Sequence, residues 1–435
     1  MDHVDTLIAA RWIVPIEPHG TVLEHHAIAI RDGRIAAVAP EKELRERYPA
    51  ARYISRPTHV LLPGFVNTHT HAAMALLRGA AESGRFEHWL HEQVRPLEQR
   101  WMDAEYVRDG TELAIADMVS SGTTCFADMH LFPEVVAQTA ADAKIRACVG
   151  CPVVDFATVW AGSTDEYFEK GIHVHDEYRN DPLVSTMLAP YASWAVCDET
   201  LRRVQRLADE LESPVAMHVN ENFADVHPSG ERTLARLERL GLLSPLLTAI
   251  HMVHVDEDDL ERAARGGIAV VHCPQSNLKL GNGIAPLGKF LEGGVTVCLG
   301  TDGAASNNDL NLLDEMRTAA LLANVGPNAA SLSAHDWLRV ATLQGAQALG
   351  LAEQIGSLVP GKWADLCCID LNRPQTQPVY DPVAHLVYAV SRDQVTDVWV
   401  AGRALLDQGT LTQLDLDDIS RRAQLWRSRI GGFSS

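Results

Sequence analysis

Between residues 60 and 300, short apolar runs alternate with longer stretches in which apolar residues recur every three or four positions. The short runs suit buried β-strands, and the longer stretches, such as 102–120, 198–211 and 308–323, suit amphipathic helices. Eight strand–helix alternations are typical of the α/β class and predict a closed parallel barrel of the TIM type, (β/α)8. The eight apolar runs are 60–65, 123–128, 145–154, 183–189, 214–219, 247–253, 268–272 and 295–300.

Both ends of the chain show a different pattern, in which short β-type runs without long helical stretches between them indicate antiparallel strands. Near the start, the runs 27–30 and 35–38 flank the pair Asp32-Gly33. Asp-Gly suits the left-handed backbone positions of a tight hairpin, so we expect a hairpin here. The N-terminal segment is therefore predicted to contribute to a small antiparallel sheet.

The same β-type pattern returns after the predicted barrel, at 355–366 and again at 398–403. The economical interpretation is one small β-sandwich domain assembled from both chain ends. The chain has 435 residues, which suits a barrel of about 250 residues together with a smaller domain. The expected division is 1–62 and 355–435 for the small domain, with a closing helix over 416–430, and 63–354 for the barrel.

Polar side chains follow four of the predicted barrel strands, at the point where each apolar run ends. Because active sites of such barrels lie at the carboxyl ends of the strands, we expect these side chains to meet at one mouth. His69 and His71 are one residue apart, so an extended backbone points both imidazoles the same way. The set is His69 and His71 after the first run, His218 and Glu221 after the fifth, His251 after the sixth and Asp302 after the eighth.

Histidines and a carboxylate in this arrangement suit one divalent metal ion with a position left for water. Bound metal lowers the pKa of water from about 16 towards about 7, so hydroxide can attack an electrophilic carbon. Glu221 is placed to move protons. His251 suits either a metal ligand or a hydrogen-bonding neighbour of the ligands. The ligand types suit zinc and iron, and zinc is our first choice.

Other histidines have simpler interpretations. His173 and His175 have the spacing of the first pair, but they lie in a charged stretch with helical character and are expected on an exposed face. His25 and His26 fall in the small β-domain and are interpreted in the same way. His272 follows a strand that continues directly into a loop, so we interpret it as structural. A histidine alone at a strand end is more often hydrogen-bonded than metal-bound.

Composition narrows the possible partners to small molecules. The net charge of −20 disfavours binding to nucleic acids and to anionic lipids. No apolar run approaches the ~18–20 residues of a membrane span, and no signal-peptide pattern is visible at the N-terminus. Of the eight cysteines, only Cys148 and Cys151 have C-x-x-C spacing, and they lie in an apolar run. We therefore expect free thiols and a cytoplasmic location.

Several motifs carry a resemblance to a known family. The segment 63–71, Pro-Gly-Phe-Val-Asn-Thr-His-Thr-His, resembles the first-strand signature of the amidohydrolase superfamily. The segments 274–283, Pro-Gln-Ser-Asn-Leu-Lys-Leu-Gly-Asn-Gly, and 300–308, Gly-Thr-Asp-Gly-Ala-Ala-Ser-Asn-Asn, narrow the resemblance, as do His218, Glu221 and His251. Together they resemble the 5-methylthioadenosine/S-adenosylhomocysteine deaminase group, which is related to the triazine chlorohydrolases. The resemblance extends over nearly the whole chain.

This resemblance implies a role for each residue of the predicted site. Glu221 corresponds to the group that carries a proton to the ring nitrogen, and His251 to a group that orients the hydroxide. Asp302 corresponds to the group that takes the proton of the water and passes it to the departing ammonia. The residues that correspond to metal ligands are His69, His71, His218 and Asp302.

The resemblance also implies substrate contacts, and two departures from the family pattern fall among them. Trp89 corresponds to an aromatic pocket wall, and Glu98 to a carboxylate that binds the ribose hydroxyls. Tyr191, in the segment 189–194, stands where the family has a histidine that contacts substrate. The segment after Glu221 is shorter than in the family. Both departures lie over the pocket, which favours retained hydrolytic chemistry with an altered or relaxed substrate.

We therefore expect a hydrolytic deaminase. It would convert an adenine nucleoside, such as 5'-methylthioadenosine, S-adenosylhomocysteine or adenosine, to the inosine-type product and ammonia. The alternative is an aminohydrolase or chlorohydrolase of the same superfamily acting on a triazine, a guanine-like base or a pterin. A non-catalytic scaffold would be expected to lack a ligand, and none is missing. The apolar barrel helices and the habit of the family predict a homo-oligomer, a dimer or a tetramer.

Overall fold

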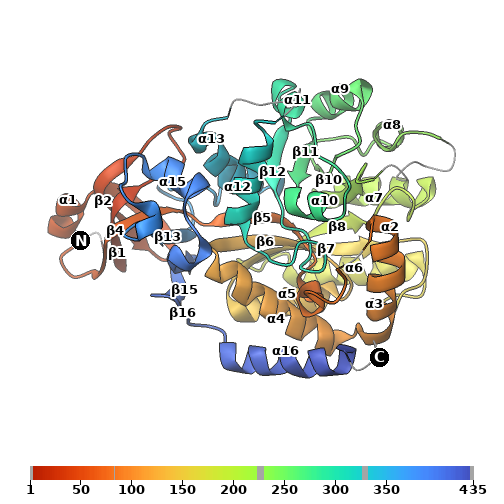
Figure 1. Ribbon diagram of the computed structural model, residues 1–435, viewed down its shortest axis with the longest axis horizontal. Coiled ribbons are helices and arrows are strands. Elements are labelled where there is room, and N and C mark those ends of the chain that lie inside the picture. Colours follow the sequence, from red (N-terminus) through yellow and green to blue (C-terminus); the bar gives the residue numbers. More distant parts are fainter. Residues whose placement is uncertain (1–2, 83, 223–229, 326–331, 432–435) are drawn as a thin grey trace.

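The computed structural model describes residues 3–82, 84–222, 230–325 and 332–431, and these form two eight-stranded sheets. One is a parallel sheet surrounded by helices, and the other is a mixed sheet beside it (Figure 1). The red N-terminal strands and the blue C-terminal strands lie together in the mixed sheet (Figure 1). Within the described ranges, no helix combines the length and the apolar character needed to cross a bilayer.

The parallel sheet confirms the predicted barrel of eight strands. Each strand pairs in parallel with the next along the chain. The last strand returns to the first, where the amide of Asp302 donates to the carbonyl oxygen of His69 at 3.0 Å. The strands are β5 (Phe65–Thr70), β6 (Thr123–Met129), β7 (Arg146–Val153), β8 (Val184–Pro190), β9 (Val215–Val219), β10 (Leu247–His251), β11 (Ala269–His272) and β12 (Thr296–Leu299).

The first apolar run belongs to two sheets, which differs from the expectation of one barrel strand over 60–65. Its first part ends β4 (Arg52–Pro63) of the mixed sheet, and Phe65 begins β5 of the barrel. Gly64 separates the two strands, and a Cβ at this residue would lie 2.1 Å from a side-chain carbon of Thr124. An apolar run does not show which sheet it joins, because both sides are buried in either case.

Helices follow most of the barrel strands and pack against the outside of the barrel. The expected helix over 198–211 is α7, and the expected helix over 102–120 is α4. Helix α4 begins directly after its N-cap residue Asp103, whose side chain accepts from the amide of Tyr106. The α-helices of this part are α2 (Phe86–His88), α3 (Arg95–Trp101), α4 (Ala104–Ser120), α5 (Pro133–Ala143), α6 (Thr164–Tyr178), α7 (Asp198–Leu211), α8 (Thr233–Arg239), α9 (Glu257–Gly266), α10 (Pro274–Lys279), α11 (Leu287–Glu292), α12 (Leu312–Leu322), α13 (Ala334–Arg339) and α14 (Gly345–Ala348).

Three short helices that are not α-helical belong to the barrel part, a 3₁₀ helix and two π-helices. They are η1 (Ala72–Leu77), η2 (Trp89–Val94) and η3 (Val340–Gln344). Apolar side chains pack in two layers, one between strands and helices and one inside the barrel. The inner layer is built from small and medium residues such as Val66, Ala127 and Ala216, which leaves the polar residues at the carboxyl ends above it.

The mixed sheet joins the two chain ends through β4, which pairs in parallel with β1 and antiparallel with β13. The predicted hairpin is present, with Asp32 and Gly33 at φ of 50° and 75° between β2 and β3. The sheet order is β16-β15-β14-β13-β4-β1-β2-β3. Its other strands are β1 (Thr6–Ile13), β2 (Leu23–Arg31), β3 (Arg34–Pro40), β13 (Leu366–Asp370), β14 (Val395–Val400), β15 (Arg403–Asp407) and β16 (Thr410–Leu411).

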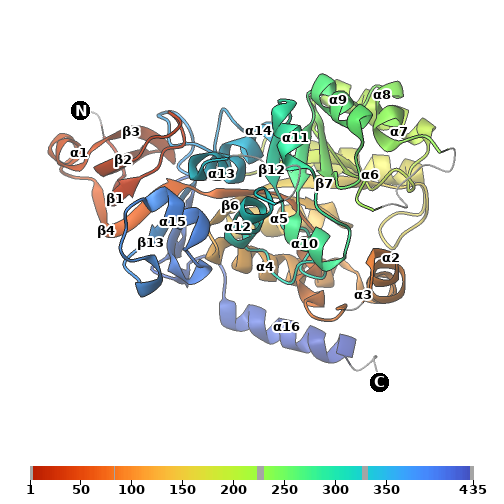
Figure 2. The same ribbon diagram turned by 45° about the horizontal axis from the view of Figure 1, so that its top comes forward.

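The closing helix does not cover this small sheet but packs along the barrel. The expected helix over 416–430 is α16 (Leu416–Gly431), and it lies beside α4 in both views (Figures 1 and 2). The indole of Trp426 donates to Asp109 of α4 at 2.9 Å. The remaining elements near the small sheet are α1 (Glu41–Arg47), α15 (Pro382–Tyr388), η4 (Pro374–Thr376) and η5 (Arg392–Gln394).

A buried ion pair joins the small sheet to the barrel. Arg146, at the start of β7, donates through Nε to Asp365 at 2.9 Å, and the two side chains are only 3% and 2% exposed. Asp365 also accepts from the amide of Ala401, and Arg146 donates to the carbonyl oxygen of Pro182. Each charge is therefore compensated by the other and by backbone groups.

We expect Asp365→Ala to lower the free energy of unfolding by about 3–5 kcal/mol, because the guanidinium of Arg146 would remain buried without its counter-ion. Urea unfolding followed by circular dichroism measures the change. The control is Arg179→Ala, which removes an ion pair with Asp176 whose side chains are 61% and 59% exposed and should cost about 1 kcal/mol or less. Equal stability of the two variants would contradict the claim that the buried pair of Arg146 and Asp365 stabilises the contact between the small sheet and the barrel.

Candidate active site

Three of the predicted histidines meet at the carboxyl end of the barrel. The ring nitrogens that His69, His71 and His218 can offer to a metal all lie within 4.8 Å of one another, and the three side chains are buried. The ring centroids of His69 and His71 are 4.8 Å apart, and those of His69 and His218 are 5.0 Å apart. The structure therefore brings together the imidazoles that strand position predicted.

Hydrogen bonds set the orientation of two of these rings. His71 donates through Nδ1 to the carbonyl oxygen of Met129, and His218 donates through Nδ1 to the carbonyl oxygen of Tyr191 at 2.7 Å. Each bond leaves Nε2 unprotonated and directed into the cluster, as in metal-binding histidines. Nε2 of His69 is buried and has no hydrogen-bond partner among the described residues. These donors fit a divalent cation.

Burial also favours the neutral form of two of these rings, His69 and His218, and the neutral form is the one that binds a metal. Burial lowers the pKa of His69 to about 4, against the opposing effect of the nearby Asp302 carboxylate. Burial likewise holds the pKa of His218 well below its usual range, and the neighbouring imidazoles act in the same direction. The three ring nitrogens that can serve as ligands therefore converge in a buried place, an arrangement that a cation would stabilise.

Asp302 completes the cluster, as the sequence predicted. Its Oδ1 lies 3.4 Å from Nε2 of His69 and 3.5 Å from Nε2 of His71. Burial alone would raise the pKa of this carboxyl, but the two imidazoles hold it well below its usual range. Glycine precedes this turn for a steric reason, since a Cβ at Gly300 would lie 2.8 Å from Cβ of His69.

Glu221 and His251 lie beside the cluster. Nε2 of His251 is 3.7 Å from Oε1 of Glu221, and its ring stacks on that of His218 with centroids 5.5 Å apart. His251 is buried but does not belong to the group of three ligand nitrogens. Of the two interpretations left open by the sequence, its position favours a hydrogen-bonding neighbour of the ligands.

Four non-glycine residues at this mouth have left-handed backbone conformations. Their φ values are 51° at Asn220, 75° at His251, 49° at Met252 and 61° at Asp302. Such conformations cost about 1–3 kcal/mol each and persist only where the surrounding structure imposes them. They sit where strands β9, β10 and β12 end, so the strain coincides with the turns that aim the polar side chains.

Sequence reasoning did not assign a role to the segment that holds these side chains in place. Three buried residues from α10 and the turn after it each bond to one polar side chain at the mouth. Ser276 donates to Oδ2 of Asp302 at 2.6 Å, Asn277 accepts from Nδ1 of His251 at 3.0 Å, and Asn282 donates to Oε1 of Glu221 at 3.0 Å.

The segment 274–283 contains several short side chains that can form hydrogen bonds, and this was the sequence signal for the three contacts. Spacing alone does not show which residues these side chains bond to. Ser306 was also missed, and it donates to Oδ2 of Asp302 at 2.8 Å. Oδ2 of Asp302 is therefore held by two hydroxyls while Oδ1 faces the histidines. These contacts fix which carboxylate oxygen is directed at the cluster.

A cavity of about 120 Å³ opens beside His71 and is lined by two of the predicted substrate-contacting residues, Glu98 and Tyr191. Burial raises the pKa of Glu98 to about 7, although Arg95 opposes the shift. The ring of Tyr191 lies 4.9 Å from that of His218. Trp89 is buried in η2 and is not among the residues that line this cavity.

The other histidines considered in the sequence do not belong to the group of three ligands. His173 is exposed on α6, and His175 contacts the Thr186 hydroxyl through Nδ1 at 2.7 Å. His272 is buried after β11 and is not one of the grouped ligands. Residues 223–229, which hold most of the segment after Glu221 that is shorter than in the family, lie outside the described residues.

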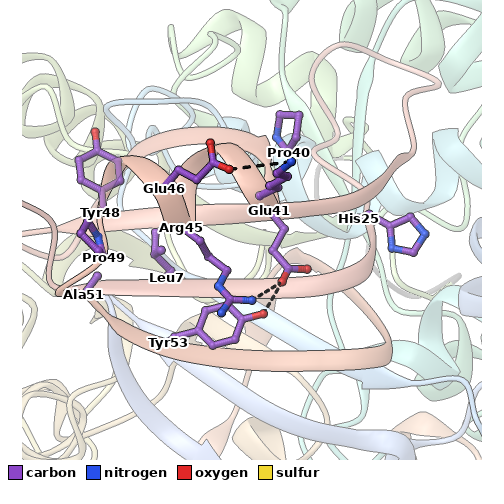
Figure 3. Close-up of a pocket in the computed structure, with 11 residues that line it drawn as sticks. Leu7, His25, Pro40, Glu41, Arg45, Glu46, Tyr48, Pro49, Ala51 and Tyr53 are labelled. Atoms are coloured by element: carbon purple, nitrogen blue, oxygen red, sulfur yellow. Dashed lines mark hydrogen bonds and ion pairs between the residues drawn. The ribbon is translucent and has the colours of Figure 1, made fainter.

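A larger groove of about 770 Å³ lies on the small sheet, away from this mouth, and His25 lines it (Figure 3). Its charged groups pair with one another rather than facing an open centre. Glu41 accepts from the hydroxyl of Tyr53 at 2.5 Å and lies 3.5 Å from a guanidinium nitrogen of Arg45 (Figure 3). Chemistry is therefore assigned to the barrel mouth, where buried groups converge.

Comparison with known families gives one match over most of the chain. The amidohydrolase family model matches residues 60–405, which includes every strand of the barrel. A second model, described as an imidazolonepropionase-like composite domain of bacteria, matches residues 27–51 in the small sheet.

Comparison with individual proteins gives matches along the full length. The chain is 43% identical over 433 residues to the 5-methylthioadenosine/S-adenosylhomocysteine deaminase of Teredinibacter turnerae, covering 98% of both. Among solved structures, it is similar to an adenosine deaminase from Xanthomonas campestris with bound zinc (TM-score 0.97, 45% identity, 99% of both chains). It is also similar to the atrazine chlorohydrolase of Arthrobacter aurescens complexed with zinc (TM-score 0.90, 25% identity, 97% of this chain and 99% of that one).

We expect the purified protein to hold about one divalent ion per chain and His218→Ala to lose most of it, because the cluster would be left with a single pair of imidazoles. Metal analysis after dialysis against a mild chelator measures the content. His173→Ala is the matched control, since that imidazole is exposed on α6, and it should keep the content of the unchanged protein. Full metal content in His218→Ala would show that the ion binds elsewhere.

Proposed function

Because the chain belongs to the amidohydrolase family, we propose that it is a hydrolytic deaminase that replaces the amino group of an adenine nucleoside with oxygen and releases ammonia. The observation that carries this proposal is the convergence of three buried imidazoles and Asp302 next to Glu221 and His251. Such a site combines a cation site with groups that can move protons, as hydrolysis of a cyclic amidine requires.

In this proposal, one divalent ion is held by the residues that the sequence predicted as ligands: His69, His71, His218 and Asp302. Bound there, the ion would lower the pKa of a water molecule so that hydroxide is available at neutral pH. The ligand types suit zinc and iron, and the zinc in two similar solved structures supports zinc.

The residues of the chain then divide the proton transfers between them. Glu221 is assigned to carry a proton to the ring nitrogen next to the reacting carbon, and Asn282 holds its Oε1 for that task. Asp302 takes a proton from the attacking water and returns it to the amino group as ammonia leaves. The hydroxyl left on the ring carbon gives its proton back to Glu221 as the carbonyl forms. One water is then consumed, one ammonia is released, and both carboxyl groups return to their starting protonation states.

His251 has an orienting role in this scheme. Its Nδ1–H donates to Asn277, which leaves the lone pair of Nε2 facing the cluster. A fixed acceptor at this point can orient an attacking hydroxyl group, and preorganised dipoles of this kind stabilise charge that develops during the reaction. The contact with Asn277 fixes the tautomer, so no rearrangement is needed when substrate binds.

The substrate class is supported by the relatives and by the cavity beside His71. The deaminase of Teredinibacter turnerae is named for 5-methylthioadenosine and S-adenosylhomocysteine, and we propose these or adenosine as substrates here. Glu98 is placed to accept hydrogen bonds from ribose hydroxyls, and Tyr191 to form a wall of the cavity. We keep the assignment of Trp89 to an aromatic wall of the substrate pocket, which rests on its correspondence to a family residue.

A second candidate keeps the chemistry and changes the heterocycle. Tyr191 lines the cavity at the position where the family has a substrate-contacting histidine, and one similar structure is an atrazine chlorohydrolase. These two observations favour a triazine as the alternative substrate, ahead of a guanine-like base or a pterin. Loss of chloride instead of ammonia would distinguish it.

Location and assembly remain proposals from the sequence. Seven of the eight cysteines are buried and all are free, which supports a reducing, cytoplasmic environment. We propose a homo-oligomer, a dimer or a tetramer, and no role in binding nucleic acid. The small-molecule substrate is the partner that the site supports.

A substrate panel tests the proposed reaction. We expect the metal-loaded protein to release ammonia from 5'-methylthioadenosine, S-adenosylhomocysteine or adenosine, with a shift of the ultraviolet spectrum from adenine to hypoxanthine. Atrazine, guanine and a pterin are assayed in parallel for ammonia and chloride. Ammonia from none of the three nucleosides would reject the proposed class, and chloride from atrazine alone would establish the alternative.

We expect Glu221→Gln to lower the rate of ammonia release by about 10²–10⁴-fold, because the amide cannot carry the proton to the ring nitrogen. The metal content should stay unchanged, since Glu221 is not one of the grouped ligands. Glu210→Gln, an exposed position on α7, serves as the control and should retain full activity. Unchanged turnover in Glu221→Gln would remove this residue from the mechanism.

A further inference from the structure

Two partly buried polar side chains face each other in the cavity beside His71 without forming a hydrogen bond. Glu98 comes from α3, and His130 directly follows β6. Nε2 of His130 lies 3.5 Å from Oε1 of Glu98, and the two side chains are 8% and 20% exposed. Neither of these two atoms has a hydrogen-bond partner within the part of the chain that the structure describes.

Their neighbours do not supply the missing partners. Arg95 lies one turn before Glu98 and lines the same cavity, but its guanidinium contacts Nδ1 of His91 at 2.9 Å and lies over the ring of Trp194. An unsatisfied buried donor or acceptor costs about 1–3 kcal/mol, so a native structure keeps one only for a reason. Two such atoms aimed into one cavity point to a ligand that bonds to both.

The chemistry of the pair defines the ligand. A carboxylate only accepts hydrogen bonds, whereas a neutral imidazole donates from one nitrogen. A hydroxyl group donates one hydrogen and accepts others, so it can donate to Glu98 and accept from His130 at the same time. Two adjacent hydroxyl groups would use both oxygens of the carboxylate.

The position of the pair relative to the metal cluster agrees with a nucleoside. The ring of His130 is 5.6 Å from that of His71, and both residues line the cavity. A heterocycle that reacts above the histidines would therefore carry its sugar towards Glu98 and His130. A free triazine or purine base has no hydroxyl pair to place there.

We propose that His130 acts with Glu98 to recognise the vicinal hydroxyl groups of a ribose, and so selects ribonucleosides over deoxynucleosides. This inference rests on the proposed deaminase function. It adds His130, which the sequence had not singled out, as a residue that determines specificity. Removing its ring nitrogen should weaken binding of ribonucleosides more than binding of nucleosides that lack the hydroxyl group it contacts.

The test compares kcat/KM for adenosine, 2'-deoxyadenosine and 3'-deoxyadenosine in the unchanged protein, His130→Phe and His130→Gln. In His130→Phe, we expect the preference for adenosine over at least one deoxynucleoside to fall about tenfold, the value of one hydrogen bond to a charged or buried group. His130→Gln should restore most of that preference, because its amide can donate from a similar place. His173→Phe, on the exposed face of α6, should leave all ratios unchanged.

The outcomes separate this inference from the proposed function. If the unchanged protein releases ammonia from adenosine, and His130→Phe lowers all three substrates equally or alters no ratio, the inference is overturned while the function stands. If the unchanged protein releases ammonia from no nucleoside, the function fails and the inference fails with it. Metal content is measured for each variant, and a ratio that shifts only in metal-depleted protein also overturns the inference.

Discussion

The contact on which the site depends is the closure of the barrel, where the amide of Asp302 donates to the carbonyl oxygen of His69. This bond ties the turn after the last strand to the first strand, so a carboxylate and an imidazole that are far apart in sequence come within 3.4 Å. Gly300 permits the approach, since any side chain there would collide with His69. Because the sheet curves round until this turn meets its first strand, the carboxyl ends of the strands lie around one mouth.

Closure also brings together buried polar groups that a bound cation would stabilise. Buried imidazoles of low pKa present lone pairs to one another, and Asp302 contributes a buried negative charge. In a low-dielectric environment such a group is stabilised by a cation far more than it would be in water. The left-handed turns at Asn220, His251 and Asp302 cost free energy, and the bonds made by Ser276, Asn277 and Asn282 hold the residues in these turns. Strain and positioning contacts thus occur at the same mouth.

The cavity beside the cluster differs from it in hydrogen bonding. Cluster residues satisfy most of their polar atoms within the protein, through carbonyl oxygens, serine hydroxyls and asparagine amides. Glu98 and His130 instead keep polar atoms buried and unpaired. A group that reacts must be held rigidly, whereas a group that recognises a ligand needs a donor or acceptor that the protein itself leaves unpaired. Nε2 of His69, which faces the cation site, is likewise without a partner among the described residues, so in both parts of the site the unpaired atoms are those directed at a ligand.

The sequence by itself determined the barrel, the small β-domain built from both chain ends and the meeting of His69, His71, His218, Glu221, His251 and Asp302, because strand period and strand-end position suffice for these. Only the tertiary structure decided that the run 60–65 is shared between two sheets, that Asn282 holds Glu221, and that His130 faces Glu98. Pairing partners and side-chain contacts depend on which loops pack over the mouth, and hydrophobic spacing carries no information about distances between loops far apart in the chain.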